Sequence, residues 1–234
     1  MASLSSIRKQ LRAAASPARR KVNEGYFKTG PGEYAEGDKF IGLSVPFLRG
    51  VAREHRDMSL SVATSLLKSA WHEERLLALI VLVRQYQKGD ERMRAAIYAL
   101  YMRSTRFINN WDLVDLSAEH IVGPHLPPGK RAVLVRLAKS KDLWERRIAM
   151  LSTFHYIRQK KFDDALRIAT ILLGDDEDLI HKAVGWMLRE IGNRDRAVEE
   201  RFLVRHAKDM PRTMLRYAIE RFPEPLRRKY LSRA

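Results

Sequence analysis

Apolar residues recur along most of this chain at positions i, i+3, i+4 and i+7. This spacing places apolar side chains on one face of an α-helix. Turn-forming residues stand at the breaks, as in Gly89-Asp90 and Pro127-Pro128-Gly129. No segment alternates in the manner of a β-strand, so the sequence predicts an all-α protein. The helices are expected at residues 4–15, 18–28, 45–56, 59–70, 72–88, 90–104, 110–122, 130–140, 142–159, 162–173, 178–193, 196–208 and 211–222.

The longest stretch without helical periodicity is residues 29–44, which contain four glycines and one proline. Glycine and proline interrupt helices, because glycine is conformationally free and proline lacks a backbone N–H. We therefore predict an irregular loop there.

The helices pair, and the second helix of each pair begins with related residues. Trp71, Trp111, Trp144, Leu179 and Met214 stand at these starts, at steps of 40, 33, 35 and 35 residues. Such steps are typical of HEAT, armadillo and tetratricopeptide repeats. Helix pairs of this kind stack into a curved solenoid whose concave side is the usual binding surface. We expect one HEAT-like repeat domain over residues 1–234, an α-α superhelix.

The charge of the chain indicates what its concave face binds. The 234 residues include 44 Lys+Arg and 28 Asp+Glu, which gives a formal net charge of +16. An excess of this size favours polyanions, and we expect the partner to be nucleic acid rather than a membrane. The most apolar stretch, residues 76–83, is too short to span a bilayer.

The lack of cysteine and the character of the N-terminal residues exclude several kinds of site and of targeting segment. There is no cysteine, which excludes disulfides, thiol catalysis and cysteine-based zinc sites. The first 20 residues are basic but lack the apolar core of a signal peptide. We expect a cytoplasmic protein, and a monomer because no exposed apolar seam is evident.

Histidine and glycine patterns give no sign of a metal or nucleotide site. The seven histidines lack metal-ligand spacing, and we expect them at the surface or at helix caps. No phosphate-binding Gly-x-x-x-x-Gly-Lys motif is present. We therefore expect no metal and no cofactor.

The candidate chemistry begins with Trp111 and Asp115. Side chains at i and i+4 share a helix face, so an indole and a carboxylate would lie side by side. On a basic chain, this pair suggests that a cation is stabilised close to a polyanion. Asp112 lies nearer the start of the helix and fits a macrodipole role better than a catalytic one.

Later helix starts add further aromatic and basic residues. Lys182, Trp186 and Arg189 share one helix face through i, i+4 and i+7 spacing, and Arg147 stands in the preceding repeat. In a solenoid these residues would face the same groove as Trp111 and Asp115. We take Lys182 and Arg189, with Arg147, as DNA-binding candidates.

Three motifs include these candidate residues. They are Asn110-Trp111-Asp112-Leu113-Val114-Asp115, Leu143-Trp144-Glu145-Arg146-Arg147-Ile148-Ala149 and Lys182-Ala183-Val184-Gly185-Trp186-Met187-Leu188-Arg189-Glu190. Together they resemble the AlkD family of HEAT-like repeat DNA glycosylases, which remove alkylated bases. The resemblance extends from about residue 20 to 220 and includes residues 25–28 and 38–46. It implies that Asp115 is catalytic, that Trp111 and Trp186 line the active site, that Arg147 faces phosphate and that Tyr26 faces DNA.

This sequence departs from the family pattern at two places. Asn110 stands where family members can carry a second tryptophan. Asp178 and Leu179 replace aromatic residues that can precede the lysine-alanine motif. These changes bear on the choice of lesion and leave the tryptophan-aspartate set intact.

The resemblance implies a monofunctional DNA glycosylase for 3-methyladenine and 7-methylguanine type lesions in duplex DNA, acting in base excision repair without base flipping. The chemistry is consistent with a single carboxylate, because an alkylated purine is already positively charged and leaves without a general acid. A non-catalytic repeat protein that binds distorted DNA is the alternative. A helical scaffold for an acidic protein is a third hypothesis, and the net charge disfavours it.

Overall fold

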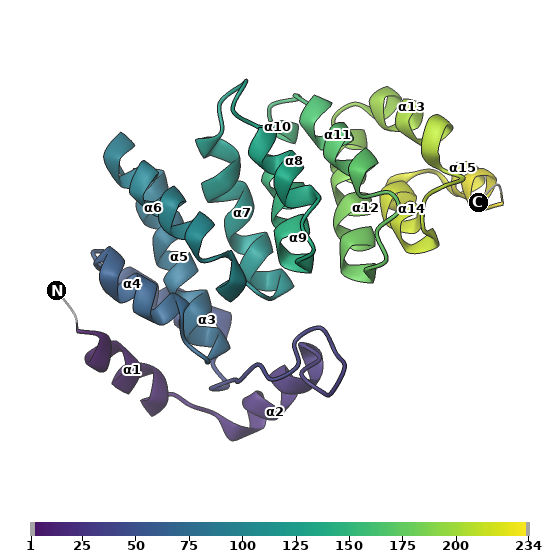
Figure 1. The fold of residues 1–234 in the computed structure, drawn as a ribbon. Coiled ribbons are helices and arrows are strands. Elements are labelled where there is room, and N and C mark those ends of the chain that lie inside the picture. The colour runs from purple at the N-terminus through teal and green to yellow at the C-terminus, as the bar shows by residue number, and fades with distance from the viewer. Residues whose placement is uncertain (1–2, 233–234) are drawn as a thin grey trace. The chain divides into compact units, whose positions relative to one another are not determined.

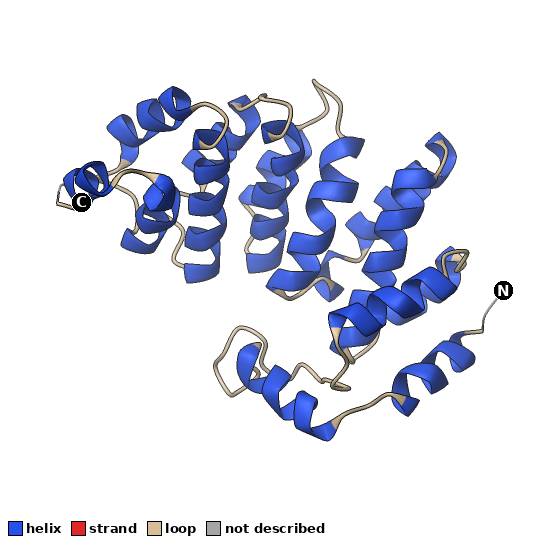
Figure 2. Cartoon of the chain, turned by 180° about the vertical axis from the view of Figure 1, so that it is seen from behind, coloured by secondary structure: helices blue, strands red, loops and turns tan. Residues whose placement is uncertain are grey.

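The computed structural model describes residues 3–232, and helices make up most of this part of the chain (Figure 1). Figure 2 shows helices joined by loops, with no strand among the described residues. One isolated parallel bridge joins Lys39 to Trp71. The prediction of an all-α fold is therefore confirmed.

The chain forms two compact units, the first ending at Ile121 and the second starting at Val122. The predictions of a single 1–234 domain and of a solenoid with a concave DNA-binding face concern the arrangement of both units, and they stay predictions.

The first unit contains seven α-helices in its described residues, the last of which crosses into the second unit, and one short 3-10 helix. They are α1 (Leu4–Ala13), α2 (Pro17–Tyr26), α3 (Val45–Glu54), α4 (Leu60–Leu67), α5 (His72–Lys88), α6 (Glu91–Arg103), η1 (Thr105–Phe107) and α7 (Trp111–His125).

The described residues of the second unit contain eight further α-helices and one short 3-10 helix. They are α8 (Ala132–Ala138), α9 (Leu143–Ser152), α10 (Phe154–Ile157), α11 (Asp163–Ile171), α12 (Asp178–Gly192), α13 (Arg196–His206), α14 (Arg212–Ala218), η2 (Ile219–Arg221) and α15 (Glu224–Leu231).

Side-chain caps fix where many of these helices begin. A serine or aspartate before the first turn accepts a hydrogen bond from a backbone N–H that the helix itself leaves unpaired. Most of these positions lie within one or two residues of the predicted starts. The capping residues are Ser3, Ser16, Ser44, Ser59, Asp90, Asp142 and Asp195.

Each unit is organised around one long helix. In the first unit α3, α4 and α6 pack against α5, whose residues 72–83 are all buried. In the second unit α12 packs against α9, α11, α13 and α14. No helix in the described part of the chain is long and apolar enough to cross a membrane.

The structure departs from the predicted helices at several places. The helix expected at 211–222 ends as α14 at Ala218 and is followed by the 3-10 helix η2. The single helix expected at 142–159 is divided at Thr153 into α9 and α10, and the Thr153 hydroxyl donates to the Met150 carbonyl. Such side-chain bonds compete with the helical ladder. Helix α7 continues through Pro124 to His125 instead of ending at 122, and α15 occupies the C-terminal basic region where no helix was expected.

Candidate active site

Trp111 and Asp115 lie on one face of α7, as their spacing predicted, and both line a pocket of about 590 Å³ in the first unit. Tyr26, at the end of α2, lines the same pocket. We call this cavity the Asp115 pocket. The structure therefore brings together three of the residues that the sequence singled out.

Aromatic rings form one wall of the Asp115 pocket. Trp111 stacks on Phe27 with ring centroids 5.4 Å apart, and Tyr26 meets the Trp111 ring edge-on at 5.9 Å. Phe27 in turn stacks on Phe40 at 5.1 Å. Tyr26 is 64% exposed, so this wall reaches solvent. Electron-rich rings at the mouth of a pocket favour a planar or cationic ligand.

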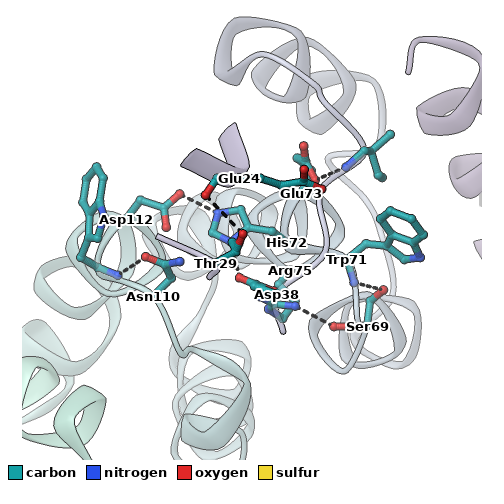
Figure 3. Close-up of polar contacts among 12 residues, drawn as sticks. Glu24, Thr29, Asp38, Ser69, Trp71, His72, Glu73, Arg75, Asn110 and Asp112 are labelled. Carbon is teal, nitrogen blue, oxygen red and sulfur yellow. Dashed lines mark hydrogen bonds and ion pairs between the residues drawn. The ribbon is translucent and has the colours of Figure 1, made fainter. Parts of the chain in front are cut away.

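His72 lies behind this wall, between two carboxylates (Figure 3). Its Nδ1 is 3.1 Å from Asp38 Oδ2 and its Nε2 is 2.8 Å from Asp112 Oδ2. Burial alone would lower the pKa of His72, but the charges of Asp112 and Asp38 and the hydrogen bonds to them outweigh burial and raise this pKa to about 9. His72 is therefore protonated at neutral pH.

This position corrects an expectation from the sequence. The prediction that the histidines lie at the surface or at caps is wrong for His72, which is 1% exposed. Asp112 is in the first turn of α7, as predicted, and it also bonds to His72. The four-residue spacing of Trp111 and Asp115 gave no sign of this partner, since His72 is 40 residues away in the sequence.

The three residues after His72 are also buried and polar, and each binds a part of the chain outside α5. Glu73 accepts hydrogen bonds from the backbone N–H groups of residues 41, 42 and 43 at 2.8–3.1 Å (Figure 3). Glu74 pairs with Arg8 and Arg12 of α1.

Arg75 completes this run. Its guanidinium is 2.5 Å from Asp38 Oδ1 and also donates to the Ser69 carbonyl (Figure 3). Residues 72–75 at the start of α5 therefore fasten α1 and the 29–44 loop, and the loop supplies Phe40 to the Asp115 pocket.

Two arginines at the Asp115 pocket were not identified from the sequence. Arg19 of α2 and Arg49 of α3 both line it and are exposed. Neither has an ion-pair partner among residues 3–232. Free guanidinium groups next to an aromatic pocket are suited to phosphate oxygens. Their sequence surroundings carry no motif, and only the fold brings them to Asp115.

The remaining predicted residues lie in the second unit, in α9 and α12. Trp186 is half-buried and meets Phe154 edge-on at 5.9 Å. Lys182 pairs with Asp178 at 2.6 Å, and Arg189 pairs with Glu220. Their roles toward DNA stay predictions.

Arg147 of α9 is placed differently from what a phosphate contact would suggest. It is 5% exposed, and its guanidinium donates to the Leu179 carbonyl at 2.5 Å. Arg147 thus holds the segment before α12, and its predicted contact with phosphate remains untested.

No group of three or more histidine and carboxylate side chains in the described residues is arranged to hold a metal ion.

No curated protein matches the sequence. A solved structure described as "Predicted DNA alkylation repair enzyme from Enterococcus faecalis" has a similar fold, with a TM-score of 0.68 and 15% sequence identity over 90% of this chain and 97% of that chain.

A family model described as DNA alkylation repair enzyme matches residues 7–222. The finer assignment to the AlkD branch stays a prediction. Because the family match covers most of the sequence, this chain belongs to the DNA alkylation repair enzyme family.

Proposed function

We propose that this protein is a DNA glycosylase that hydrolyses the N-glycosidic bond of positively charged alkylated purines in duplex DNA. A role in the repair of alkylated DNA follows from the family. The observation that carries the finer proposal is the pairing of Asp115 with Trp111 in one aromatic pocket of a chain with net charge +16.

The substrate supplies its own activation. A purine methylated at N3 or N7 carries a positive charge, so it departs as a neutral base when it takes the electron pair of the C1′–N bond. No general acid is needed, in contrast to ordinary glycosidases with their two carboxylates. What requires stabilisation is the oxocarbenium-like sugar that remains.

Asp115 is suited to that task. Its carboxylate offsets the charge that develops on the sugar, orients a water molecule and takes up the proton when the water oxygen bonds to C1′. Trp111 and Tyr26 add cation–π attraction, worth about 0.5–2 kcal/mol for each ring according to its desolvation. Both rings are at the pocket, and Tyr26 is at its exposed edge.

Phosphate contacts fix the register of the DNA without reading its sequence. Arg19 and Arg49 are the groups that we assign to this role beside Asp115, since both line the pocket and are exposed. Trp186, Lys182, Arg189 and Arg147 are proposed from the resemblance to contribute from the second unit. The same resemblance supports action on the sugar with the base left in the helix.

Release of 7-methylguanine from methylated duplex DNA tests the proposal. We expect the wild-type protein to release this base and Asp115→Asn to lower the single-turnover rate at least 100-fold, on the scale of other electrostatic stabilisers. DNA binding by the variant should be retained, because Asp115 repels phosphate.

The matched control is Asp176→Asn, which removes an exposed carboxylate in the second unit. This control should leave both release and binding unchanged. A wild-type protein that binds DNA yet releases no more base than buffer would support the non-catalytic alternative. Equal loss of binding and release in Asp115→Asn would make Asp115 a structural residue.

A further inference from the structure

The first unit has a second cavity, at the carboxyl end of α5, that shares no lining residue with the Asp115 pocket. Its volume is about 860 Å³, within the range of ligand sites in proteins. The end of α3, the turn before α4 and the last turns of α5 form its walls. We call it the α5-end pocket, with Arg53, Arg56, Asp57, Arg84, Gln85 and Lys88 among its lining residues.

Positive charge dominates the α5-end pocket. Four cationic side chains and one carboxylate line it, which leaves 4 − 1 = +3. Arg53, Arg84 and Lys88 have no ion-pair partner among residues 3–232. Arg56 and Asp57 are 3.5 Å apart but 76% and 86% exposed, so their pairing is weak. An anion in the pocket would relieve the repulsion among these cations.

Hydrogen bonds build the floor of this pocket. Gln85 Nε2 donates to the carbonyls of Arg56 and Met58 at 2.9 and 2.7 Å, which fixes the turn before α4 on α5. Gln85 Oε1 is buried and has no partner within the described chain. Gln85 therefore shapes the floor of the pocket, and the attraction for an anion comes from the surrounding cations.

A neighbouring arginine makes the site more favourable for an anion. The carbonyls at the carboxyl end of a helix normally repel negative charge. Arg94 Nε donates to the Tyr86 carbonyl at 3.1 Å, and Arg94 Nη2 donates to the Gln87 carbonyl at 3.4 Å. The end of α5 is thus partly neutralised before any ligand binds.

We propose that the α5-end pocket is a second DNA-contact site, which binds the phosphodiester backbone of a strand at a position separate from Asp115. Guanidinium groups match phosphate oxygens in charge and geometry. Four cations spread over this volume exceed what one free phosphate needs and suit consecutive phosphates of a polymer. DNA is the partner that the family implies.

The test is the salt dependence of binding to a short undamaged duplex, measured by fluorescence anisotropy. The R84A/K88A double variant should show a slope of log affinity against log salt that is smaller by about 2, because each phosphate contact contributes about 0.9. Affinity at low salt should fall about tenfold or more. If alanine impairs folding, as a melting curve would show, R84Q/K88Q removes the same charges with longer polar side chains.

The control is K9A/R103A, which also removes one lysine and one arginine from the first unit. Both residues are exposed and line neither pocket. We expect its salt slope to stay close to that of the wild type. Equal changes in the two double variants would overturn the proposal, because they would reflect net charge alone.

A second arm separates DNA from small phosphates. Inorganic phosphate and a mononucleotide are added to the wild type and to R84A/K88A, and the shift in melting temperature is measured. If the small anions stabilise only the wild type while duplex binding is the same in both, the proposed DNA site is rejected. Because the duplex is undamaged, this outcome does not depend on whether the protein releases a base.

Discussion

At the scale of single residues, His72 joins two segments that surround the Asp115 pocket. It lies between Asp38 and Asp112, and the pKa of its imidazole is raised from 6.5 to about 9. A group that binds its proton more tightly in the folded state stabilises the fold below its ordinary pKa. This contribution should be fully present below pH 6.5 and lost as the pH rises through about 9.

The variant His72→Gln tests this contribution to stability, because the glutamine side chain does not titrate. We expect the wild type to lose about 2–3 kcal/mol of its free energy of unfolding between pH 6.5 and 9.5 through this histidine. The variant should lack that part of the decline, as measured by urea unfolding at each pH. His120→Gln, on α7, is the control and should keep the wild-type dependence. Parallel curves for wild type and His72→Gln would contradict the ion-pair interpretation.

The positions of Asp112 and Asp115 were predictable from the sequence, but not all of their contacts were. Spacing placed Asp115 beside Trp111, and the structure has both at one pocket. The first-turn position of Asp112 suggested a macrodipole role, and the structure adds a bond to His72. A contact between residues far apart in the sequence depends on how helices pack, which helical periodicity alone does not encode.

At the scale of elements, the helices were largely predictable because their starts carry local chemistry. Ser44 precedes α3 and Asp90 precedes α6, and both cap as their residue types suggest. The division at Thr153 was not predictable, since the apolar periodicity continues through it. The attachment of the 29–44 loop to α5 could not be predicted from the sequence either. Glu73 binds backbone N–H groups of this loop, and no side-chain pattern indicates where those groups lie.

Gly42 shows how closely this loop approaches α2. Its φ is +88°, and a Cβ there would meet the backbone of Ser16 and would lie 2.7 Å from the Arg20 nitrogen. Gly42→Ala should therefore destabilise the protein by about 2–5 kcal/mol, from backbone strain together with overpacking. The midpoint of urea unfolding measures the loss.

Gly37→Ala separates the two causes. Gly37 also has a positive φ, of +77°, but a Cβ there would meet nothing within 4 Å. The free energy of unfolding of this control should fall only by the backbone strain, about 1–3 kcal/mol. If both variants lose the same stability, the steric contact between residue 42 and α2 does not contribute to the loss.

At the scale of the whole molecule, each of the two compact units contains a buried group with a raised pKa. His72 is in the first unit, and Glu199 of α13 is in the second. Burial raises the pKa of Glu199 from 4.5 to about 8, against the opposing charge of Arg196, and the side chain is 1% exposed. The folded second unit thus favours the neutral acid, and its stability should fall as the pH rises from 4.5 to about 8.

These two groups make the independence of the units measurable. Hydrogen exchange of backbone amides, corrected for the intrinsic effect of pH, should show protection declining between pH 5 and 8 in the second unit and between pH 6.5 and 9 in the first. Glu199→Gln should remove the decline in the second unit, worth about 2 kcal/mol or more, and leave the first unit unchanged. Glu200→Gln on the same helix is the control. If Glu199→Gln raised protection equally in both units, the chain would unfold as one cooperative body, and the prediction of a single 1–234 domain would be favoured over two separately unfolding units.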